Sequence, residues 1–325
     1  MDLSIVIVNW NATEYLRACL TSLYRKPRTV TFEVIVVDNG SYDGCEKVLR
    51  EEFPGVIFVQ SEKNLGFSRA NNLGFSHASG ELILFLNPDT EVVGDALERM
   101  ISCAQSNSSA GAVGTRLLNT DGSLQTSCVQ ALPTIWNQLL DSELLRRAFP
   151  SWSIWGTRAL FNHDSQPIAV EAISGACFMV RRSVFEQVGL FDEEYFMYSD
   201  DVDLSWKIKS AGHLIFYLNG SEVIHHGGKS SAKQESHFED VAQREALLKF
   251  FRKRRGDFCS KLYRASMASI AALRMAIVIC LVPLAGTGLQ RKTTKSVLRK
   301  WVMIFLWAIG RTNRPEVAGA RSIPA

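Results

Sequence analysis

The sequence predicts an α/β fold, in which helices cover both faces of a mostly parallel central sheet and a helical tail follows. Two observations predict the sheet. Short, continuous apolar runs, typical of strands buried on both faces, recur through the first part of the chain. Between them lie stretches with apolar residues at helical spacing, so that strands and helices alternate. The tail is predicted by a change in charge, because basic residues dominate from Arg244 to Lys300, where the acids are Glu245 and Asp257.

The apolar runs give the strands of the predicted sheet. They are residues 3–8, 32–37, 56–59, 82–86, 112–114, 172–180 and 214–218. Their β-branched and aromatic composition favours buried strands. Apolar residues at helical spacing predict helices after Thr13 and Gly44, at residues 69–77 and 95–104, and after the acids near residue 200.

The chain is expected to divide into a sheet domain, residues 1–243, and a helical tail, residues 244–325. The first half of the sheet domain takes residues 1–115, and a second part takes residues 171–243. Between them, residues 120–170 have weak periodicity, many turn residues and several tryptophans. This composition is typical of an insertion or flap.

Composition and cysteine usage exclude several classes of protein. With 46% hydrophobic and 21% charged residues the chain is globular, and a net charge of +3 implies no nucleic-acid partner. The seven cysteines are odd in number and none are in Cys-x-x-Cys spacing, which indicates reduced, buried thiols in a cytosolic protein. No basic region followed by an apolar core opens the chain, so we expect no secretory signal.

Polar residues end two of the strands, where parallel sheets bind ligands. Asp38 follows the second strand and Asp89 follows the fourth. Plain turn chemistry is the alternative for both, because residues 38–41 and 87–89 are also turn-like sequences. Asp43 is explained equally well by helix capping.

Three carboxylates fall within four residues, at Asp200, Asp201 and Asp203. Acids at a helix start often cap free N–H groups and suit the positive end of the helix dipole. The alternative is a general base at the rim of a pocket. Neighbouring negative charges would help such a base, because they raise a carboxylate pKa.

Seven motifs, in order, resemble the inverting family 2 glycosyltransferases of the GT-A fold, a Rossmann-like architecture, and are most similar to their bacterial rhamnosyltransferase-like branch. The motifs are residues 5–10, 36–44, 64–72, 86–90, 174–176, 191–204 and 225–230. Each motif alone is weak evidence for the family, but all seven in this order at plausible spacing are a specific signal. They span the first 230 residues.

The resemblance implies transfer of a sugar, with inversion, from a nucleoside diphosphate donor to a glycan or lipid-linked glycan acceptor in cell-surface polysaccharide synthesis. It points to dTDP-rhamnose as the donor, and it assigns donor binding to the first half of the sheet domain and catalysis to the second part. A nucleotidyltransferase is one alternative, but it should carry a glycine-rich, basic loop where Asn9-Trp10-Asn11 stands. A non-catalytic sugar-nucleotide-binding protein is another, against which the intact set of Asp38, Asp89, Asp201 and His225 argues.

The resemblance also implies roles for individual residues. Asp201 is the base that takes the proton of the acceptor hydroxyl, and the residues that support it on the acceptor side are Asp200, Asp203 and Trp206. The expected nucleotide-binding residues are Asn9, Asp38, Asn64, Gly66, Arg69 and Asn87. Among them, Asp38 would accept the imide N–H of uracil or thymine, and the fixed charge of Arg69 suits a diphosphate.

Asp89 and His225 are expected to hold a divalent metal, Mn²⁺ or Mg²⁺, together with the donor diphosphate. The family usually has an Asp-x-Asp motif, but here Asn87 stands in place of the first acid, so the site carries less charge. The motif fits His225 better than His226. An imidazole ligand favours Mn²⁺ over Mg²⁺.

The tail is expected to bind a membrane. Residues 265–289 carry a single charge and are broken by Pro283, with basic flanks at 252–255 and 291–300. We favour helices that lie on, or dip into, the anionic cytoplasmic leaflet, so that the protein is cytoplasmic and attached to the inner face of the cell membrane. A spanning helix and a buried helical hairpin that caps the domain are the alternatives.

Overall fold

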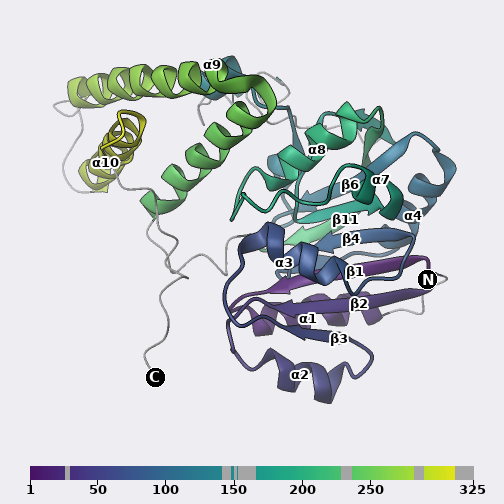
Figure 1. Ribbon diagram of the computed structural model, residues 1–325. Helices are drawn as coiled ribbons and strands as arrows, with labels where there is room; N and C mark the ends of the chain where they lie inside the picture. Colours follow the sequence, from purple (N-terminus) through teal and green to yellow (C-terminus); the bar gives the residue numbers. More distant parts are fainter. Residues whose placement is uncertain are drawn as a thin grey trace. The chain divides into compact units, whose positions relative to one another are not determined.

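The computed structural model describes residues 1–25, 30–140, 148–149, 152, 166–227, 236–281 and 289–311 of the chain (Figure 1). The chain forms two compact units. The sheet unit comprises Met1–Leu132 with Ser142–Ala232, and the helical unit comprises Pro133–Asp141 with Lys233–Ala325. Each is described by itself.

The sheet unit is built on a nine-stranded sheet with the order β3-β2-β1-β4-β10-β6-β11-β5, in which β8 also pairs with β11. The strands are β1 (Leu3–Asn9), β2 (Phe32–Asp38), β3 (Ile57–Gln60), β4 (Leu82–Leu86), β5 (Thr90–Val92), β6 (Ala110–Leu118), β8 (Ile168–Val170), β10 (Cys177–Arg181) and β11 (Leu214–His225). The four strands from β3 to β4 are parallel. Beyond them the sheet is mixed, because β10 enters antiparallel between β4 and β6.

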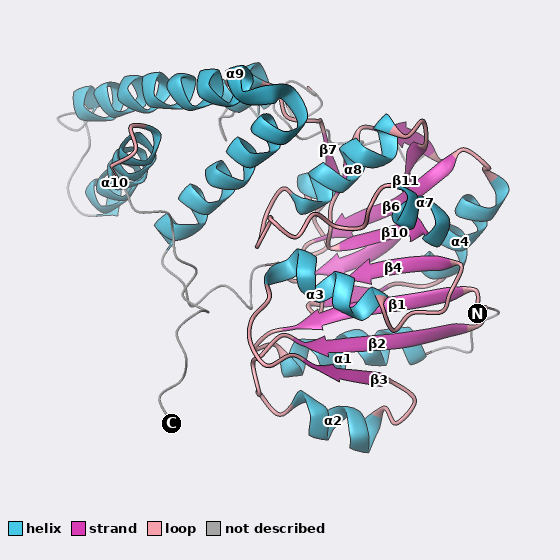
Figure 2. Ribbon diagram, in the orientation of Figure 1, coloured by secondary structure: helices cyan, strands magenta, loops and turns pink. Residues whose placement is uncertain are grey.

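Helices cover both faces of this sheet, which confirms the predicted α/β class. Figure 2 shows α3 (Gly66–Phe75) and α8 (Asp200–Ser210) in front of the sheet and α1 (Thr13–Tyr24) behind it. The other α-helices that the described residues of this unit form are α2 (Cys45–Glu52), α4 (Ala96–Ser106) and α7 (Arg182–Gln187). All five residues of β4 are buried, as expected for a strand covered on both faces.

The residues expected to form an insertion, 120–170, are partly built into the sheet unit. A 3-10 helix, η1 (Thr126–Cys128), leads into β7 (Val129–Gln130), which pairs with β9 (Ala172–Ile173). The beginning of the expected insertion or flap is thus joined to the sheet unit by strand pairing. Much of the rest of it, at 141–147, 150–151 and 153–165, lies outside the described residues.

The helical unit contains α5 (Ile135–Leu139), α9 (Ser236–Leu281) and α10 (Leu289–Ala308). The expected boundary at residue 243 falls inside α9, and this segment of the helical unit begins earlier, at Lys233. The first turn of α9 carries an acid, Glu239, which suits the positive end of the helix dipole. Gly256, with φ 88° and ψ 168°, divides α9 into two helical halves.

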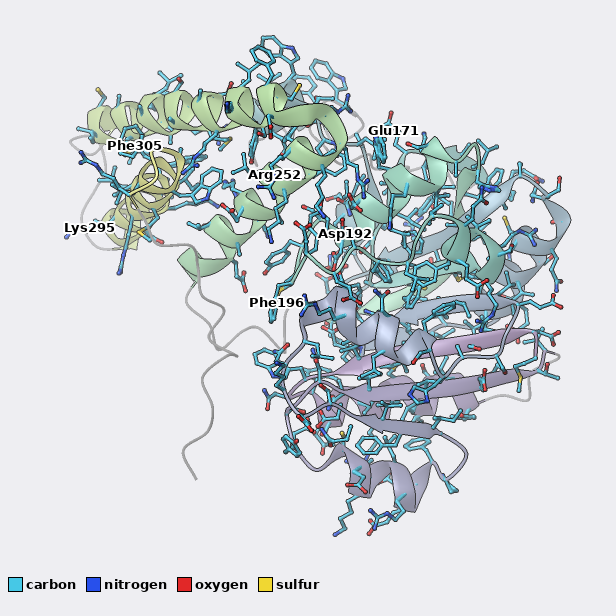
Figure 3. All side chains as sticks on the ribbon, in the orientation of Figure 1. Glu171, Asp192, Phe196, Arg252, Lys295 and Phe305 are labelled. Carbon is cyan, nitrogen blue, oxygen red and sulfur yellow. The ribbon has the colours of Figure 1, made fainter. Side chains whose placement is uncertain are left out.

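Side chains fasten α10 to both halves of α9. The Trp307 indole N–H donates to Glu245 Oε2 at 2.7 Å in the first half. From the second half, Arg264 donates to the carbonyl oxygens of Trp307 and Ala308 at 3.0 and 2.9 Å, which caps the end of α10. The apolar core between them is formed by Val241, Phe251, Tyr263, Met267, Ala271, Trp301, Ile304 and Trp307, with Phe305 packed against it (Figure 3).

The second half of α9 also presents an apolar face to solvent. Phe258, Leu262, Leu273 and Ile277 are exposed and share one side of the helix, as their spacing of 4, 11 and 4 residues requires. By length and apolar composition the helix Glu239–Cys280 could cross a membrane, and 17% of its most apolar window is buried. The expected break at Pro283 lies outside the described residues.

Candidate active site

Several of the predicted site residues lie at the ends of strands, among them Asn9, Asp38 and His225. The parallel register of β1 and β2 pairs Asn9 with Asp38, so the two side chains end neighbouring strands. Antiparallel pairing of β5 with the end of β11 sets Thr90 opposite His225. Strand pairing therefore assembles two separate groups of polar residues from distant parts of the sequence.

Asp38 is fully buried, and protein donors occupy its carboxylate. Oδ1 accepts from Asn9 Nδ2 at 3.3 Å and from the Ser41 hydroxyl. Oδ2 accepts from the Tyr42 backbone N–H at 3.0 Å and from Gln60 Nε2 at 2.9 Å. Because a carboxylate offers about four lone-pair positions, a nucleobase N–H can bind Asp38 only where one of these donors gives way.

Asp43 caps helix α1. Its Oδ2 accepts the Thr13 backbone N–H at 3.2 Å, and its Oδ1 accepts from Asn9 at 3.1 Å and from the Cys45 backbone N–H at 3.3 Å. Burial alone would raise the pKa of Asp43, but these hydrogen bonds outweigh it and hold the pKa below its usual value. The capping interpretation therefore explains Asp43.

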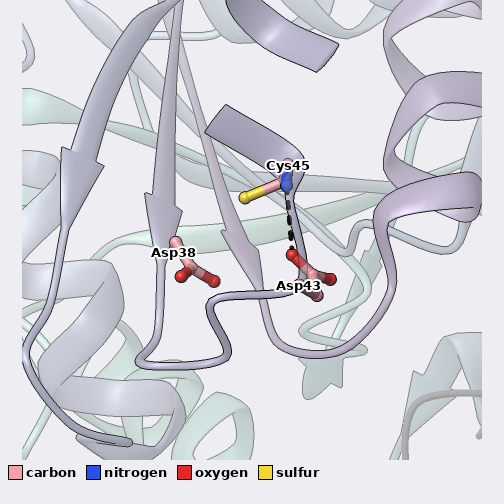
Figure 4. A group of neighbouring side chains, drawn as sticks. All are labelled: Asp38, Asp43 and Cys45. Atoms are coloured by element: carbon pink, nitrogen blue, oxygen red, sulfur yellow. Dashed lines mark hydrogen bonds between the residues drawn. The ribbon is translucent and has the colours of Figure 1, made fainter. Parts of the chain in front are cut away.

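Asp38, Asp43 and Cys45 lie close enough together to hold a metal ion, since their ligand atoms are all within 4.8 Å of one another (Figure 4). Their chemistry does not fit a metal. Both carboxylates already accept N–H or O–H donors, which occupy the positions that a cation would need. Burial also raises the pKa of the Cys45 thiol, which keeps it protonated, whereas a metal binds the thiolate. We interpret this cluster as the network that fixes the turn after β2.

Asn64 and Gly66 shape the loop that enters α3. Asn64 Oδ1 accepts the Gly66 backbone N–H at 2.9 Å and Asn39 Nδ2 at 3.0 Å. Gly66 has φ +79°, and a Cβ there would lie 2.4 Å from the Phe196 carbonyl oxygen. The Phe67 N–H donates to the same oxygen at 2.7 Å, so the loop is tied to the segment before the acidic stretch (Figure 3).

Arg69 lies on the exposed side of α3. Its Nε is 3.6 Å from Glu193 Oε2, and 55% of each side chain is exposed. Such a surface ion pair contributes about 0–1 kcal/mol. A diphosphate could therefore replace Glu193 as the partner of Arg69 at little cost.

Asp89 and His225, the two predicted metal ligands, face each other. His225 Nε2 lies 3.3 Å from Asp89 Oδ1, and the Asp89 side chain is only 6% exposed. Among the described residues, the His225 ring is the only polar partner of this carboxylate. A nearly buried carboxylate without N–H donors lacks compensating positive charge.

This pair fits a divalent cation. Two neighbouring ligands of an octahedral site with metal–ligand distances of about 2.1 Å lie about 3 Å apart, close to the 3.3 Å between His225 Nε2 and Asp89 Oδ1. Asn87 Nδ2 is also 3.3 Å from His225 Nε2, so the third residue expected here belongs to the same group.

His226 has other partners. Its Nε2 is 2.9 Å from Glu91 Oε1, and its Nδ1 is 3.0 Å from Thr120 Oγ1. Its backbone N–H donates to the Asp89 carbonyl oxygen at 2.9 Å, which ties the two segments together. Of the two histidines, His225 is thus the one that faces Asp89; residues 228–230 of this motif lie outside the described residues.

A strained turn introduces the acidic stretch. Helix α8 begins at Asp200, directly after Tyr198 and Ser199, which have φ of 69° and 60°. Residues other than glycine in this region cost about 1–3 kcal/mol each and often mark functional sites. The Asp201 carboxylate reaches the loop between β9 and β10, where Gly175 has no side chain to block its approach.

Asp201 and Asp200 differ in their partners. Asp201 accepts from the Gly175 backbone N–H at 2.9 Å, the Val202 backbone N–H at 2.8 Å and Gln130 Nε2 at 3.3 Å. One of its about four lone-pair positions is therefore left for a ligand. Burial raises the pKa of Asp201, and these three hydrogen bonds oppose the rise.

Asp200 retains a proton near neutral pH. Burial, and then the negative charge of Asp201, raise its pKa to about 8. Its Oδ2 is buried and has no hydrogen-bond partner among the described residues. The three donors at Asp201 favour its ionised form, whereas no donor among the described residues does so at Asp200 Oδ2.

Asp203 and Trp206 complete the predicted set on α8. Asp203 is buried and accepts the Tyr195 hydroxyl at 3.2 Å, which joins the start of α8 to the segment before it. Trp206 is half-buried. Phe191, which opens the motif at residues 191–204, is a core residue that packs against Phe85 with ring centroids 4.8 Å apart.

Sequence reasoning missed three side-chain amides of this region. Gln60 contacts Asp38, Gln130 contacts Asp201, and Gln125 contacts His225. A glutamine carries no charge, and these three recur with no period, so only the folded structure identifies them.

Known proteins share both the sequence and the fold. The N-acetylglucosaminyl-diphospho-decaprenol L-rhamnosyltransferase of Mycobacterium tuberculosis is 30% identical over 249 residues, which cover 71% of this chain and 78% of the relative. The rhamnosyltransferase WbbL of Escherichia coli K12 is 26% identical over 231 residues, covering 68% and 82%.

One similar solved structure is that of the mannosyltransferase PcManGT from Pyrobaculum calidifontis in complex with GDP-Man and Mn²⁺. It aligns with a TM-score of 0.58 at 18% sequence identity, and the alignment covers 96% of this chain and 88% of that chain. This likeness confirms the GT-A fold. The model of the family described as glycosyl transferase family 2 matches residues 4–189. The chain therefore belongs to glycosyl transferase family 2 and is a glycosyltransferase.

Proposed function

We propose that this glycosyltransferase moves a sugar from a nucleoside diphosphate donor to a glycan hydroxyl with inversion, and that Asp201 is the base. The observation that carries the proposal is the Asp201 carboxylate, which accepts three hydrogen bonds, has one lone-pair position open and lies beside Asp200, whose pKa is raised by burial. Inversion needs one in-line displacement at the anomeric carbon, during which the acceptor hydroxyl loses its proton to a carboxylate. The proton would move from this hydroxyl to Asp201.

Asp89 and His225 would hold Mn²⁺ or Mg²⁺ with the donor diphosphate. Their facing ligand atoms, 3.3 Å apart, support this role. When bound, the metal supplies Lewis-acid stabilisation of the charge that develops on the diphosphate. The imidazole favours Mn²⁺.

The nucleotide would lie along the carboxyl ends of β1, β2 and β4. Asp38, supported by Asn9, would read the base, with the base N–H taking the position now held by Gln60. Asn64 and Gly66 would shape the loop beside it, and Asn87 would contact the nucleotide next to the metal ligands. The exposed guanidinium of Arg69 would meet the diphosphate.

The proposed donor is dTDP-rhamnose and the proposed acceptor a lipid-linked glycan in cell-surface polysaccharide synthesis. Both rest on the two relatives, which are named as rhamnosyltransferases, one of them for a decaprenol-linked N-acetylglucosamine. A lipid-linked acceptor would also explain the exposed apolar face of α9. We infer that this face binds the anionic inner leaflet of the cell membrane, because basic residues at 252–255 precede it.

The test is a screen of donors with the purified full chain, Mn²⁺ and a short-chain polyprenyl diphosphate carrying N-acetylglucosamine. dTDP-rhamnose, UDP-N-acetylglucosamine and GDP-mannose are compared for transfer, and NMR reads the anomeric configuration of the product. Transfer from dTDP-rhamnose with an inverted anomer is expected. Transfer from another donor would overturn the choice of sugar, and a retained anomer would overturn the base mechanism.

A further inference from the structure

Gln125 lies between β6 and η1, in the segment expected to be an insertion, and contacts His225 twice. Its Nε2 donates to the His225 backbone carbonyl oxygen at 2.6 Å. Its Oε1 lies 2.9 Å from His225 Nδ1. One side chain thus holds both the main chain and the ring of the predicted metal ligand.

Chemistry fixes which way this amide points. A backbone carbonyl oxygen can only accept a hydrogen bond, so the amide nitrogen must be the end that faces it. The amide oxygen then faces His225 Nδ1, and because that oxygen can only accept, Nδ1 must carry a hydrogen. In the neutral imidazole the lone pair is consequently on Nε2, the atom 3.3 Å from Asp89 Oδ1.

We propose that Gln125 is a positioning residue that fixes the tautomer and ring orientation of His225, so that the Nε2 lone pair faces Asp89 and a metal ion. The inference rests on the metal role proposed above for Asp89 and His225. It adds a residue that none of the seven motifs contains.

Both partners are attached to regular structure, which makes the contact rigid. The Gln125 backbone N–H donates to the Leu117 carbonyl oxygen of β6 at 2.9 Å, and its carbonyl oxygen accepts the Cys128 N–H of η1 at 3.1 Å. His225 is fixed by pairing of β11 with β5. The ring is therefore oriented before any ligand arrives.

Without this contact the two neutral tautomers would mix. In the other tautomer an N–H on Nε2 would donate to Asp89 and occupy the space of the cation. Loss of such an outer partner of a metal-bound histidine typically weakens metal affinity about 10–100-fold. We expect a loss in this range when Gln125 is changed.

The experiment uses the full chain with ¹⁵N-labelled histidine, in which His225 is assigned by its absence in His225→Asn. Metal-free ¹⁵N shifts report the tautomer, and broadening by added Mn²⁺ reports the affinity. Gln125→Met should mix the tautomers and raise the dissociation constant for Mn²⁺ about 10–100-fold. Gln105→Met removes an exposed amide on α4 and should change neither reading.

The outcomes separate this inference from the metal role itself. Wild-type tautomer and wild-type Mn²⁺ affinity in Gln125→Met would overturn the positioning role while leaving the metal site intact. Unchanged Mn²⁺ affinity in both Asp89→Asn and His225→Asn would instead show that the metal binds elsewhere. In that case the tautomer in the metal-free protein still decides whether Gln125 orients the ring.

Discussion

The amide of Gln130 and the backbone N–H of Gly175 donate to the same oxygen of Asp201, at 3.3 and 2.9 Å. Pairing of β7 with β9 sets Gln130 opposite Ala172, three residues before Gly175, and so brings both donors to this carboxylate. Two donors on one oxygen favour the ionised form of Asp201, which is the form that a base needs.

Changing Gln130→Met should therefore raise the pKa of Asp201. A base works only when deprotonated, so the acidic limb of kcat/KM should move to higher pH, by about one unit if the lost hydrogen bond contributes about 1.4 kcal/mol. The pH profile measured beside Gln105→Met, an exposed amide, checks this. A limb that stays in place would mean that Gln130 does not act on the base.

Asp201→Asn should lower kcat by about 10²-fold or more, because general base catalysis typically contributes about 10²–10⁴-fold. Binding of the donor nucleotide, measured by calorimetry, should not change. Asp200→Asn is the matched control, since it mimics the protonated form that Asp200 already has at neutral pH. Equal losses in both variants would contradict the assignment of Asp201 as the base.

Asp200→Asn should stabilise the fold at neutral pH. The folded-state pKa of Asp200, about 8, lies above its unfolded value, so wild-type stability falls as pH rises from about 4 to 8. The variant lacks this loss, and its advantage in Tm should grow across the same window. A gain of 1 kcal/mol corresponds to roughly 2–4 °C for a domain of this size. Thermal unfolding of both proteins at pH 5 and pH 8 measures the change, and an advantage that is constant with pH would refute it.

Gln60→Leu should strengthen binding of UDP or dTDP by a few-fold. The change removes the donor at 2.9 Å from Asp38 and leaves one acceptor position free for the base N–H. Asp38→Asn should weaken binding of the same nucleotides by about ten-fold or more, since it removes a charge-assisted hydrogen bond. Calorimetry with both nucleotides tests the pair, and weaker binding by Gln60→Leu would show that Gln60, and not Asp38 alone, contacts the base.

Replacing Leu273 and Ile277 together by glutamate should reduce binding to anionic lipid vesicles about a hundred-fold. Both are exposed on the apolar face of α9, and full burial of each contributes roughly 1.5–3 kcal/mol. The control replaces Gln105 and Ser106, which are exposed on α4, by glutamate and so adds two acidic residues away from the apolar face. Co-sedimentation with phosphatidylglycerol vesicles gives the result, and vesicle binding equal to that of the control would exclude this face.

Sequence patterns are sufficient where a strand end carries the chemistry. Asp38, Asp89 and His225 stand at ends of apolar runs, so the strand pattern alone places them at one edge of the sheet. The same patterns are insufficient where a contact depends on register or on a loop. Asp38 and Asp43 are alike as residues in a turn, yet only the folded chain shows that donors already fill the first and that the second caps α1.

The predicted boundary of the helical unit is wrong for a related reason. The change in charge begins at Arg244, but α9 begins at Ser236, so the helix extends beyond the segment with the basic composition. The composition of the apolar run at residues 265–289 also does not show where its single charge, Arg274, points. This guanidinium lies 4.5 Å from the Trp301 ring and donates to the Leu139 carbonyl oxygen at 3.2 Å, so the single charge of the run faces the inside of the helical unit.

The short stretch from Gln125 to Gln130 places one amide on His225 and another on Asp201. For protein engineering, this sets where chimeras can be joined. The composition of residues 120–170 suggests exchanging them as a block with those of a relative to alter acceptor choice. Such an exchange would remove both amides. A junction after Leu132, where the sheet unit's first segment ends, would keep them and still exchange the rest.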